Sequence, residues 1–400
     1  MSAPGNQLPD RLVPAATEWP RASYRFVSPN GTAIAADTHL SVPDPVRGTD
    51  PVGAIVERLR AGAQGTVAVG LLPFRAGAPV RVSVTAKPRA SREPTASGSP
   101  PAPAGGMRVK LCSVQPEPAE VHYVAAVEEA LRRLGSGRLD KVVLARTLHL
   151  TAESPVSVHE LLASLRRGNP HAYVFAAPLA AGRTLVGASP ELLVAKEGGN
   201  VVSHPLAGTT PRSADPDEDA RRAGALLRSA KDLREHALVV DAVAAALRPY
   251  CRRLRVPARP SLTRTATLWH LGTRVRGVLR DPATSSLALA AALHPTPAVC
   301  GTPTDAARDL IGELEPFDRG YYAGTVGWCN TAGDGEWAVA IRCAEVEDRS
   351  LRLFSGAGIV PGSSPQGELA ETAAKFGTLL DALGLDKRAL ALARARPTST

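Results

Sequence analysis

The chain has 400 residues, of which 44% are hydrophobic and 21% are charged, so it can bury a core in one large domain or two. It contains no apolar run of about 18 residues, and we therefore expect no membrane span and no membrane partner. The formal net charge is +9, but the arginines are spread along the chain and aromatic residues make up only 4%. We expect no nucleic-acid partner, because such surfaces need clustered basic residues and rings for stacking.

The cysteine count disfavours a disulfide framework and a zinc site, because it is odd and no pair has C-x-x-C spacing. The five are Cys112, Cys251, Cys300, Cys329 and Cys343. We therefore expect a protein of the reducing cytoplasm. Residues 1–20 contain no apolar core of the signal-peptide type and are predicted to be a disordered N-terminus, and residues 386–400 are predicted to be a flexible tail.

The N-terminal part of the fold is expected over residues 21–116. Its hydrophobic residues alternate as in β-strands, for example over 67–74 and 80–84, with a helical stretch near 51–62. Residues 85–106 are rich in Pro, Ser and Ala and are predicted to be a long loop.

The main part of the fold is expected over residues 117–385. Helices are predicted near 117–134, 157–167, 215–247, 284–293 and 303–313, and after Ser364. Strands are predicted near 140–150, four times within 172–208, and near 251–256, 264–278, 320–330, 336–347 and 350–356. The turn at Gly198 predicts that the last two of the four strands form a hairpin. Many strands with a few long helices indicate an α+β fold.

The last glycine-rich loop runs into a helix, which Ser364 is placed to cap and Pro365 to begin. At about 100° per residue, Glu368, Glu371 and Lys375 fall on one stripe of that helix. The stripe could hold a divalent cation and an anion together. It could equally be a solvated face with an ordinary i,i+4 pair between Glu371 and Lys375.

Four other charged positions lie in apolar surroundings. Lys141 opens an apolar strand, and Glu191 stands between two strands. Glu235 lies in a helix with an apolar face, and Arg342 lies inside an apolar strand. Each has a structural alternative, since a strand-end lysine can reach solvent, an arginine can pair with a core carboxylate and a helical glutamate can face water. Taken singly, the four positions leave both interpretations open.

These positions belong to longer motifs that follow one another along the chain. The motifs are Lys141-Val-Val-Leu-Ala-Arg, Gly187-Ala-Ser-Pro-Glu, Pro205-Leu-Ala-Gly-Thr, Lys231-x-x-x-Glu-His, Leu268-Trp-His-Leu, His294-Pro-Thr-Pro, Glu313-Leu-Glu-Pro-Phe-Asp-Arg, Ala340-Ile-Arg and Gly356-Ala-Gly-Ile-Val-Pro. From about residue 21 to residue 385, the chain resembles the chorismate-utilising enzymes, such as anthranilate synthase component I, salicylate synthase and isochorismate synthase. The resemblance implies a single large α+β domain of two stacked antiparallel sheets flanked by helices, with 117–385 as the chorismate-binding catalytic core.

Two positions indicate that water rather than ammonia is the nucleophile. The amine-transferring members carry Gln where this chain has Lys141, and aminodeoxychorismate synthases carry Lys where it has Ala207. Residues 294–301 resemble isochorismate synthases of the siderophore type. The resemblance therefore implies conversion of chorismate to isochorismate for siderophore or related secondary metabolism. Tyr322 keeps salicylate synthase open as an alternative, and a non-catalytic chorismate-binding protein is the alternative of a different class.

The resemblance also implies how the charged residues divide their work. Glu235 and Glu371, with Glu368 acting through water, would hold a Mg²⁺ ion that takes the ring carboxylate. Arg342 would clamp the pyruvyl carboxylate with its planar fork.

Two further residues would move protons. Lys141 would be the general base on a water that attacks C2, and Glu191 the general acid for the departing C4 hydroxyl. Burial would favour the neutral lysine and the protonated glutamate that these roles need. The remaining substrate contacts implied by the resemblance are Lys375, Gly208, Thr209, His270, Ala298, Val299, Tyr322, Ile341, Gly356, Ala357 and Gly358. The resemblance favours a monomer.

Overall fold

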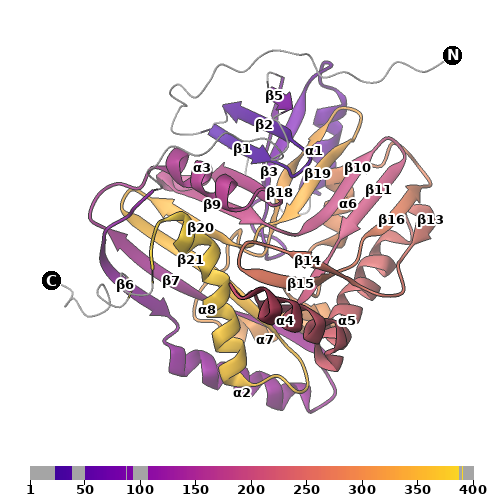
Figure 1. Cartoon of the computed structure of the whole chain (residues 1–400). Coiled ribbons are helices and arrows are strands. Elements are labelled where there is room, and N and C mark those ends of the chain that lie inside the picture. Colours follow the sequence, from indigo (N-terminus) through magenta and orange to yellow (C-terminus); the bar gives the residue numbers. More distant parts are fainter. Residues whose placement is uncertain (1–22, 38–49, 87, 93–106, 387–389, 391–400) are drawn as a thin grey trace.

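The computed structural model describes residues 23–37, 50–86, 88–92, 107–386 and 390 (Figure 1). Predictions for residues 1–20, for most of the loop at 85–106 and for most of the tail at 386–400 fall outside these ranges. Where the structure does describe the expected loop, Arg89–Arg92 form a strand that pairs with Thr32–Asp37, so the loop prediction was wrong there. No helix in the described ranges has the length and apolar character of a membrane span.

Two large antiparallel sheets carry most of the strands. The first contains, in spatial order, β17 (Gly301–Thr302), β7 (Lys141–Ala152), β21 (Ser350–Ile359), β20 (Cys343–Glu347), β9 (Thr184–Ser189), β8 (Tyr173–Pro178), β1 (Ser23–Val27), β2 (Thr32–Asp37) and β5 (Arg89–Arg92), and β6 (Leu111–Glu117) also pairs with β7. The second contains β13 (Cys251–Arg255), β16 (Val275–Leu279), β11 (Asn200–His204), β10 (Leu192–Glu197), β19 (Gly335–Val339), β18 (Thr325–Asn330), β3 (Val67–Leu72) and β4 (Arg81–Thr85). The expectation of two stacked antiparallel sheets is confirmed.

A third sheet, which we call the small sheet, was not predicted. It contains β12 (Leu206–Pro211), β15 (Leu268–Gly272) and β14 (Ser261–Arg264). Pro205 separates β12 from β11, because a proline has no N–H to give to a ladder of backbone hydrogen bonds. Residues 172–208 therefore hold parts of five strands rather than four, distributed over three sheets.

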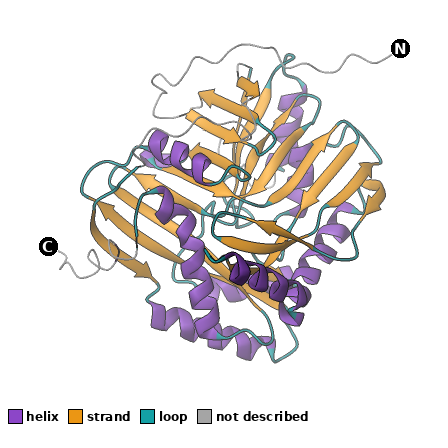
Figure 2. Cartoon of the chain, viewed as in Figure 1, coloured by secondary structure: helices purple, strands orange, loops and turns teal. Residues whose placement is uncertain are grey.

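Eight α-helices in the described ranges flank the sheets, as the purple ribbons of Figure 2 show. They are α1 (Pro51–Arg60), α2 (Glu120–Leu134), α3 (Val158–Gly168), α4 (Pro216–Arg228), α5 (Ala230–Leu247), α6 (Ser286–Leu293), α7 (Thr304–Leu314) and α8 (Pro365–Ala382). Helices α3 and α8 pack against the first sheet, α1, α5 and α6 against the second, and α4 and α5 against the small sheet. The predicted caps are confirmed, since Ser157 accepts a hydrogen bond from Glu160 N and Ser364 accepts one from Gly367 N.

Three further segments that were predicted as single elements are divided. The strand predicted at 264–278 is divided into β15 in the small sheet and β16 in the second sheet. The helical region 215–247 breaks at Ser229, whose side chain caps α5 by accepting a hydrogen bond from Asp232 N at 3.2 Å. The strand predicted at 336–347 breaks at residues 340–342, and its halves β19 and β20 join different sheets. Arg342, at the break, has a left-handed φ of 51°.

The chain has one large apolar core and a smaller one. β7 contributes to both, with Val142 and Leu144 in the large core and Leu148 and Leu150 in the smaller core under α3 and α8. A buried ion pair connects this strand to the end of α7. Arg319 donates to the carbonyl oxygens of Val143 and Val299, each at 2.7 Å, and pairs with Glu315.

We expect Glu315→Gln to lower the free energy of unfolding by about 3 kcal/mol, because it leaves the guanidinium of Arg319 buried without its counter-ion. Glu313→Gln is the matched control, since the exposed ion pair of Glu313 with Arg133 contributes about 0.5 kcal/mol or less. Urea unfolding of both variants provides the measurement. Equal stability of the two variants would contradict the prediction.

Candidate active site

A cavity lies where the small sheet, α5, α8, β21 and the break between β19 and β20 meet. It is lined by Pro190, Glu191, Leu206, Ala207, Gly208, Thr209, Glu235, His270, Ala298, Ile341, Arg342, Gly356, Gly358, Glu371 and Lys375. Most of the predicted site residues therefore share one cavity. The other predicted residues, which do not line it, are Lys141, Val299, Tyr322, Ala357 and Glu368. Pro190, Leu206 and Ala207 line the cavity without having been predicted as site residues, since an apolar residue within a motif carries no chemical signal of its own.

Glu191 is the acidic residue that follows the end of β9. Its side chain is buried, and Leu206 N lies at hydrogen-bonding distance, 3.5 Å, from its Oε1. Burial raises the pKa of Glu191 to about 7, against the opposing charges of Lys141, Lys375 and Arg342. The carboxyl group is therefore about half protonated at neutral pH, which suits a general acid.

Lys141 does not line the cavity itself but contacts Glu235, which does. Its side chain is fully buried, and its Nζ lies 2.9 Å from Oε1 of Glu235 on α5. Gly358 of β21 makes room for this pair, because a Cβ at that position would lie 2.2 Å from Glu235 Oε1 and 2.9 Å from Lys141 Cε. The interpretation of Lys141 as a lysine that reaches solvent is therefore wrong.

Arg342 is a buried guanidinium without an ion-pair partner among the described residues. Its Nη1 has no hydrogen-bond partner there either. Burial lowers the pKa of Arg342 to about 10, so the side chain still carries its charge at neutral pH. A buried, unpaired guanidinium costs free energy, and an anion bound in the cavity would compensate for it.

The three glutamates of the predicted metal site are each paired with a lysine. Besides the pair of Glu235 with Lys141, Glu371 lies 2.6 Å from Lys375 Nζ and Glu368 lies 2.8 Å from Lys231 Nζ. Burial, with the nearby charge of Glu371, raises the pKa of Glu368. The face of α8 is therefore turned to the cavity rather than to solvent, although the ordinary i,i+4 pair is present.

These carboxylates fit a hard divalent cation by their chemistry. They crowd negative charge into one region, which a cation would neutralise, and oxygen donors suit Mg²⁺. Within the described ranges, no group of three acidic, histidine or cysteine side chains is already arranged around a metal position. The lysine partners would have to move aside before a cation could bind.

His270 on β15 and Thr209 on β12 lie opposite each other on neighbouring strands of the small sheet. Thr209 Oγ1 lies 3.1 Å from His270 Nδ1, while His270 Nε2 is buried and has no partner in the described part of the chain. Burial holds the pKa of His270 well below its usual range, so its ring is neutral at neutral pH. The free nitrogen can exchange a hydrogen bond with a bound molecule.

The hydroxyl group of Tyr322 lies close to Gly356 of β21. Its ring is stacked on Phe354 with centroids 5.0 Å apart, and a Cβ on Gly356 would lie 2.8 Å from its hydroxyl oxygen. The predicted substrate contact of Tyr322 stays a prediction, as do those of Val299 and Ala357.

Comparison with known proteins decides the family. The sequence model of the chorismate binding enzymes matches residues 92–384. The chain is a member of this family. Isochorismate synthase DhbC of Bacillus subtilis is 58% identical to this chorismate-binding enzyme over 279 residues, which are 68% of this chain and 70% of DhbC. The vibriobactin-specific isochorismate synthase of Vibrio cholerae is 41% identical over 92% of this chain and 93% of its own.

Solved structures agree with this assignment. The crystal structure of DhbC from Bacillus anthracis superposes on this chorismate-binding enzyme with a TM-score of 0.85. The match has 43% sequence identity and covers 92% of this chain and 98% of that one. The fold is thus common to both proteins.

We expect Gly358→Ala to weaken chorismate binding about tenfold or more, because the added methyl group displaces the carboxylate of Glu235. Gly377→Ala on α8 is the matched control, since a Cβ there meets no atom within 4 Å. The KM for chorismate, measured for both variants at saturating Mg²⁺, provides the measurement. An unchanged KM in Gly358→Ala would show that the position of Glu235 is unimportant for binding.

Proposed function

We propose that this enzyme is an isochorismate synthase, which converts chorismate to isochorismate. The observation that carries the proposal is that one cavity combines a protonatable, buried Glu191 with the buried amine of Lys141 behind its wall. A base and an acid of this kind are what the addition of water at one ring carbon and the loss of a hydroxyl at another require. The relatives named as isochorismate synthases support the same activity.

Substrate binding rests on the cationic side chains of the cavity. Arg342 binds the pyruvyl carboxylate, because it is the buried cation without a counter-ion of its own. Lys375 adds a second cationic donor. The strand of Gly356, Ala357 and Gly358 is paired with β7, and successive N–H groups of a strand point to opposite edges. Only alternate N–H groups of these three residues can therefore face the substrate.

Glu235, Glu371 and Glu368 would hold the Mg²⁺ ion that the family implies. When bound, the ion supplies positive charge for the ring carboxylate of the substrate. The two helices α5 and α8 supply the carboxylates from two sides of the cavity.

The reaction needs one proton removed and one delivered. Lys141 takes a proton from the water whose oxygen bonds to C2, and the ring double bonds shift. Glu191 gives a proton to the C4 hydroxyl, which leaves as water when the C4–O bond breaks. Glu235 has to give up its ion pair with Lys141 before that lysine can act as a base.

We also propose that the enzyme works in the cytoplasm as a monomer. The five cysteines, all within the described ranges, have free thiols, which fits a reducing compartment. The monomer is carried over from the family resemblance.

Incubation of the purified protein with chorismate and Mg²⁺, followed by chromatographic separation of the products, tests the proposal. We expect isochorismate as the product. Salicylate with pyruvate would instead assign the chain to the salicylate synthases. The absence of any Mg²⁺-dependent product would overturn the catalytic assignment in favour of a binding protein.

We expect the protonation of Glu191 to give kcat/KM a pH limb centred near pH 7, on which activity falls by up to tenfold per pH unit as the pH rises, because Glu191 must be protonated to act as the acid. Glu191→Gln should lower kcat by about 10³-fold and remove this limb of the pH profile. Glu345→Gln, which only loses an ion pair with Arg183, is the control and should keep the profile. Full turnover in Glu191→Gln would refute the acid assignment.

A further inference from the structure

The small sheet forms the wall of the cavity that carries His270 and Thr209. These two residues stand directly opposite each other in the pairing of β12 with β15. The register shifts between Ala207 and Thr209, and Gly208, in between, has a φ of 79°. The position of this wall therefore depends on how β12 and β15 are held, because neither strand belongs to one of the two large sheets.

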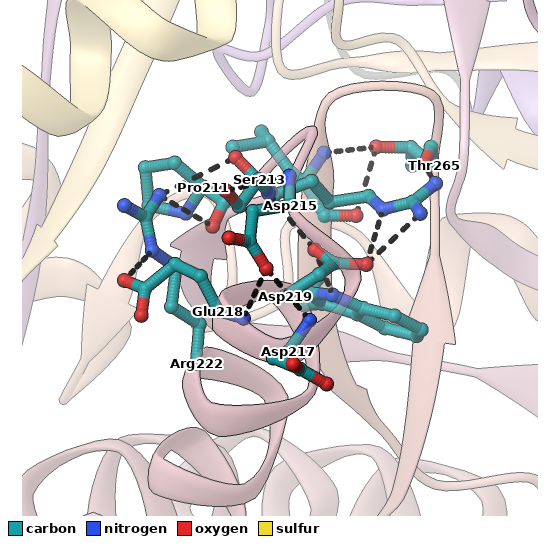
Figure 3. A network of polar contacts seen from close by, with 11 residues as sticks. Pro211, Ser213, Asp215, Asp217, Glu218, Asp219, Arg222 and Thr265 are labelled. Atoms are coloured by element: carbon teal, nitrogen blue, oxygen red, sulfur yellow. Dashed lines mark hydrogen bonds and ion pairs between the residues drawn. The ribbon is translucent and has the colours of Figure 1, made fainter.

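A single carboxylate on the first turns of α4 holds both strands. Asp219 accepts hydrogen bonds at Oδ1 from Ser213 N and from Trp269 Nε1, each at 2.9 Å. At Oδ2 it accepts from Nε and Nη2 of Arg212, at 3.2 and 3.0 Å. Figure 3 shows Asp219 between Ser213 on one side and the segment of Thr265 on the other. The four hydrogen bonds come from the chain after β12 and from β15.

Arg212 strengthens the same connection. Its guanidinium lies 5.3 Å from the centre of the Trp269 ring, and its backbone N donates to Thr267 O at 2.9 Å. Hydrogen bonds from Arg212, Ser213 and Trp269 hold the pKa of Asp219 at about 2, so the carboxylate stays charged throughout the physiological pH range. None of the network residues lines the cavity.

The peptide bond between Trp269 and His270 connects the hydrogen-bond network of Asp219 to the cavity. Trp269 immediately precedes His270 in β15, and successive side chains of a strand point to opposite faces. Trp269 is therefore bound on the α4 side, while His270 presents its unpartnered Nε2 on the other.

We propose that Asp219 is a positioning residue, which sets the orientation of His270 toward the substrate by holding Trp269 and the chain after β12. The proposal rests on the proposed function only for the identity of the substrate. Without the carboxylate, the indole N–H and the guanidinium lose their shared acceptor, while the backbone pairing of β12 with β15 remains. The Trp269 side chain can then reorient, and the His270 ring on the other face of β15 loses its fixed orientation.

A double-mutant cycle tests whether Asp219 acts through His270. We expect Asp219→Asn to raise KM for chorismate about tenfold in the wild-type background and to have little further effect in the His270→Gln background, since coupled residues are not additive. An equal effect in both backgrounds would overturn the proposal. Trp269→Phe keeps an aromatic side chain but removes the indole N–H, and it should reproduce the change if Asp219→Asn fails to fold.

A second readout does not depend on turnover. In protein labelled at histidine, the ring signals of His270, assigned with His270→Gln, should shift in Asp219→Asn and in Trp269→Phe. The ring signals of His294, which is hydrogen-bonded to Pro73 O, should stay in place. Arg221→Gln on α4, which only loses an exposed pair with Glu218, is the matched control and should leave KM and all ring signals unchanged.

The two readouts separate this proposal from the proposed function. If the wild-type protein fails to convert chorismate while the His270 signals shift, the function is wrong and the positioning role stands. If the protein converts chorismate but the His270 signals and the coupling are absent, the positioning role is wrong.

Discussion

The buried ion pair between Lys141 and Glu235 is the contact around which the cavity is built. It joins the first residue of β7 to the N-terminal half of α5. A charge pair in such a position is tolerated only when both partners are present and closely placed. Gly358 of β21 provides that space, because any side chain there would collide with both members of the pair. The strands β7 and β21 and the helix α5 are thereby held in one arrangement.

The cavity carries more charge than an ordinary protein interior. Three glutamates are each matched by a lysine, whereas Arg342 has no matching carboxylate among the described residues. The unmatched cation marks the place for an anionic ligand, and the crowded carboxylates mark the place for a cation. Glu191 differs from the other acids of the cavity because it has no ion-pair partner in the described residues, and burial therefore decides its protonation. One fold thus holds three lysine-paired carboxylates and one protonatable carboxyl group within a short space.

The interruptions of regular structure lie close to this chemistry. Pro205 ends β11 and allows β12 to leave the second sheet, Ser229 separates α4 from α5, and Arg342 turns the chain between the two large sheets. Each interruption directs a different element toward the cavity. The network of Asp219 connects α4 to the small sheet and to the chain after β12.

The amino-acid sequence by itself determined the α+β class, the capped helices after Ser157 and Ser364, the hairpin at Gly198 and the family. These features depend on neighbours in the chain or on whole motifs, so they can be recognised without a structure. Only the tertiary structure decided the third sheet and the breaks at Pro205 and Arg342, because strand pairing joins residues that are distant in sequence. It also decided that Glu371 and Lys375 face a cavity rather than water, and that Arg342 is a buried cation without an ion-pair partner among the described residues. Burial and the distance between charges set these properties, and neither is encoded in local spacing.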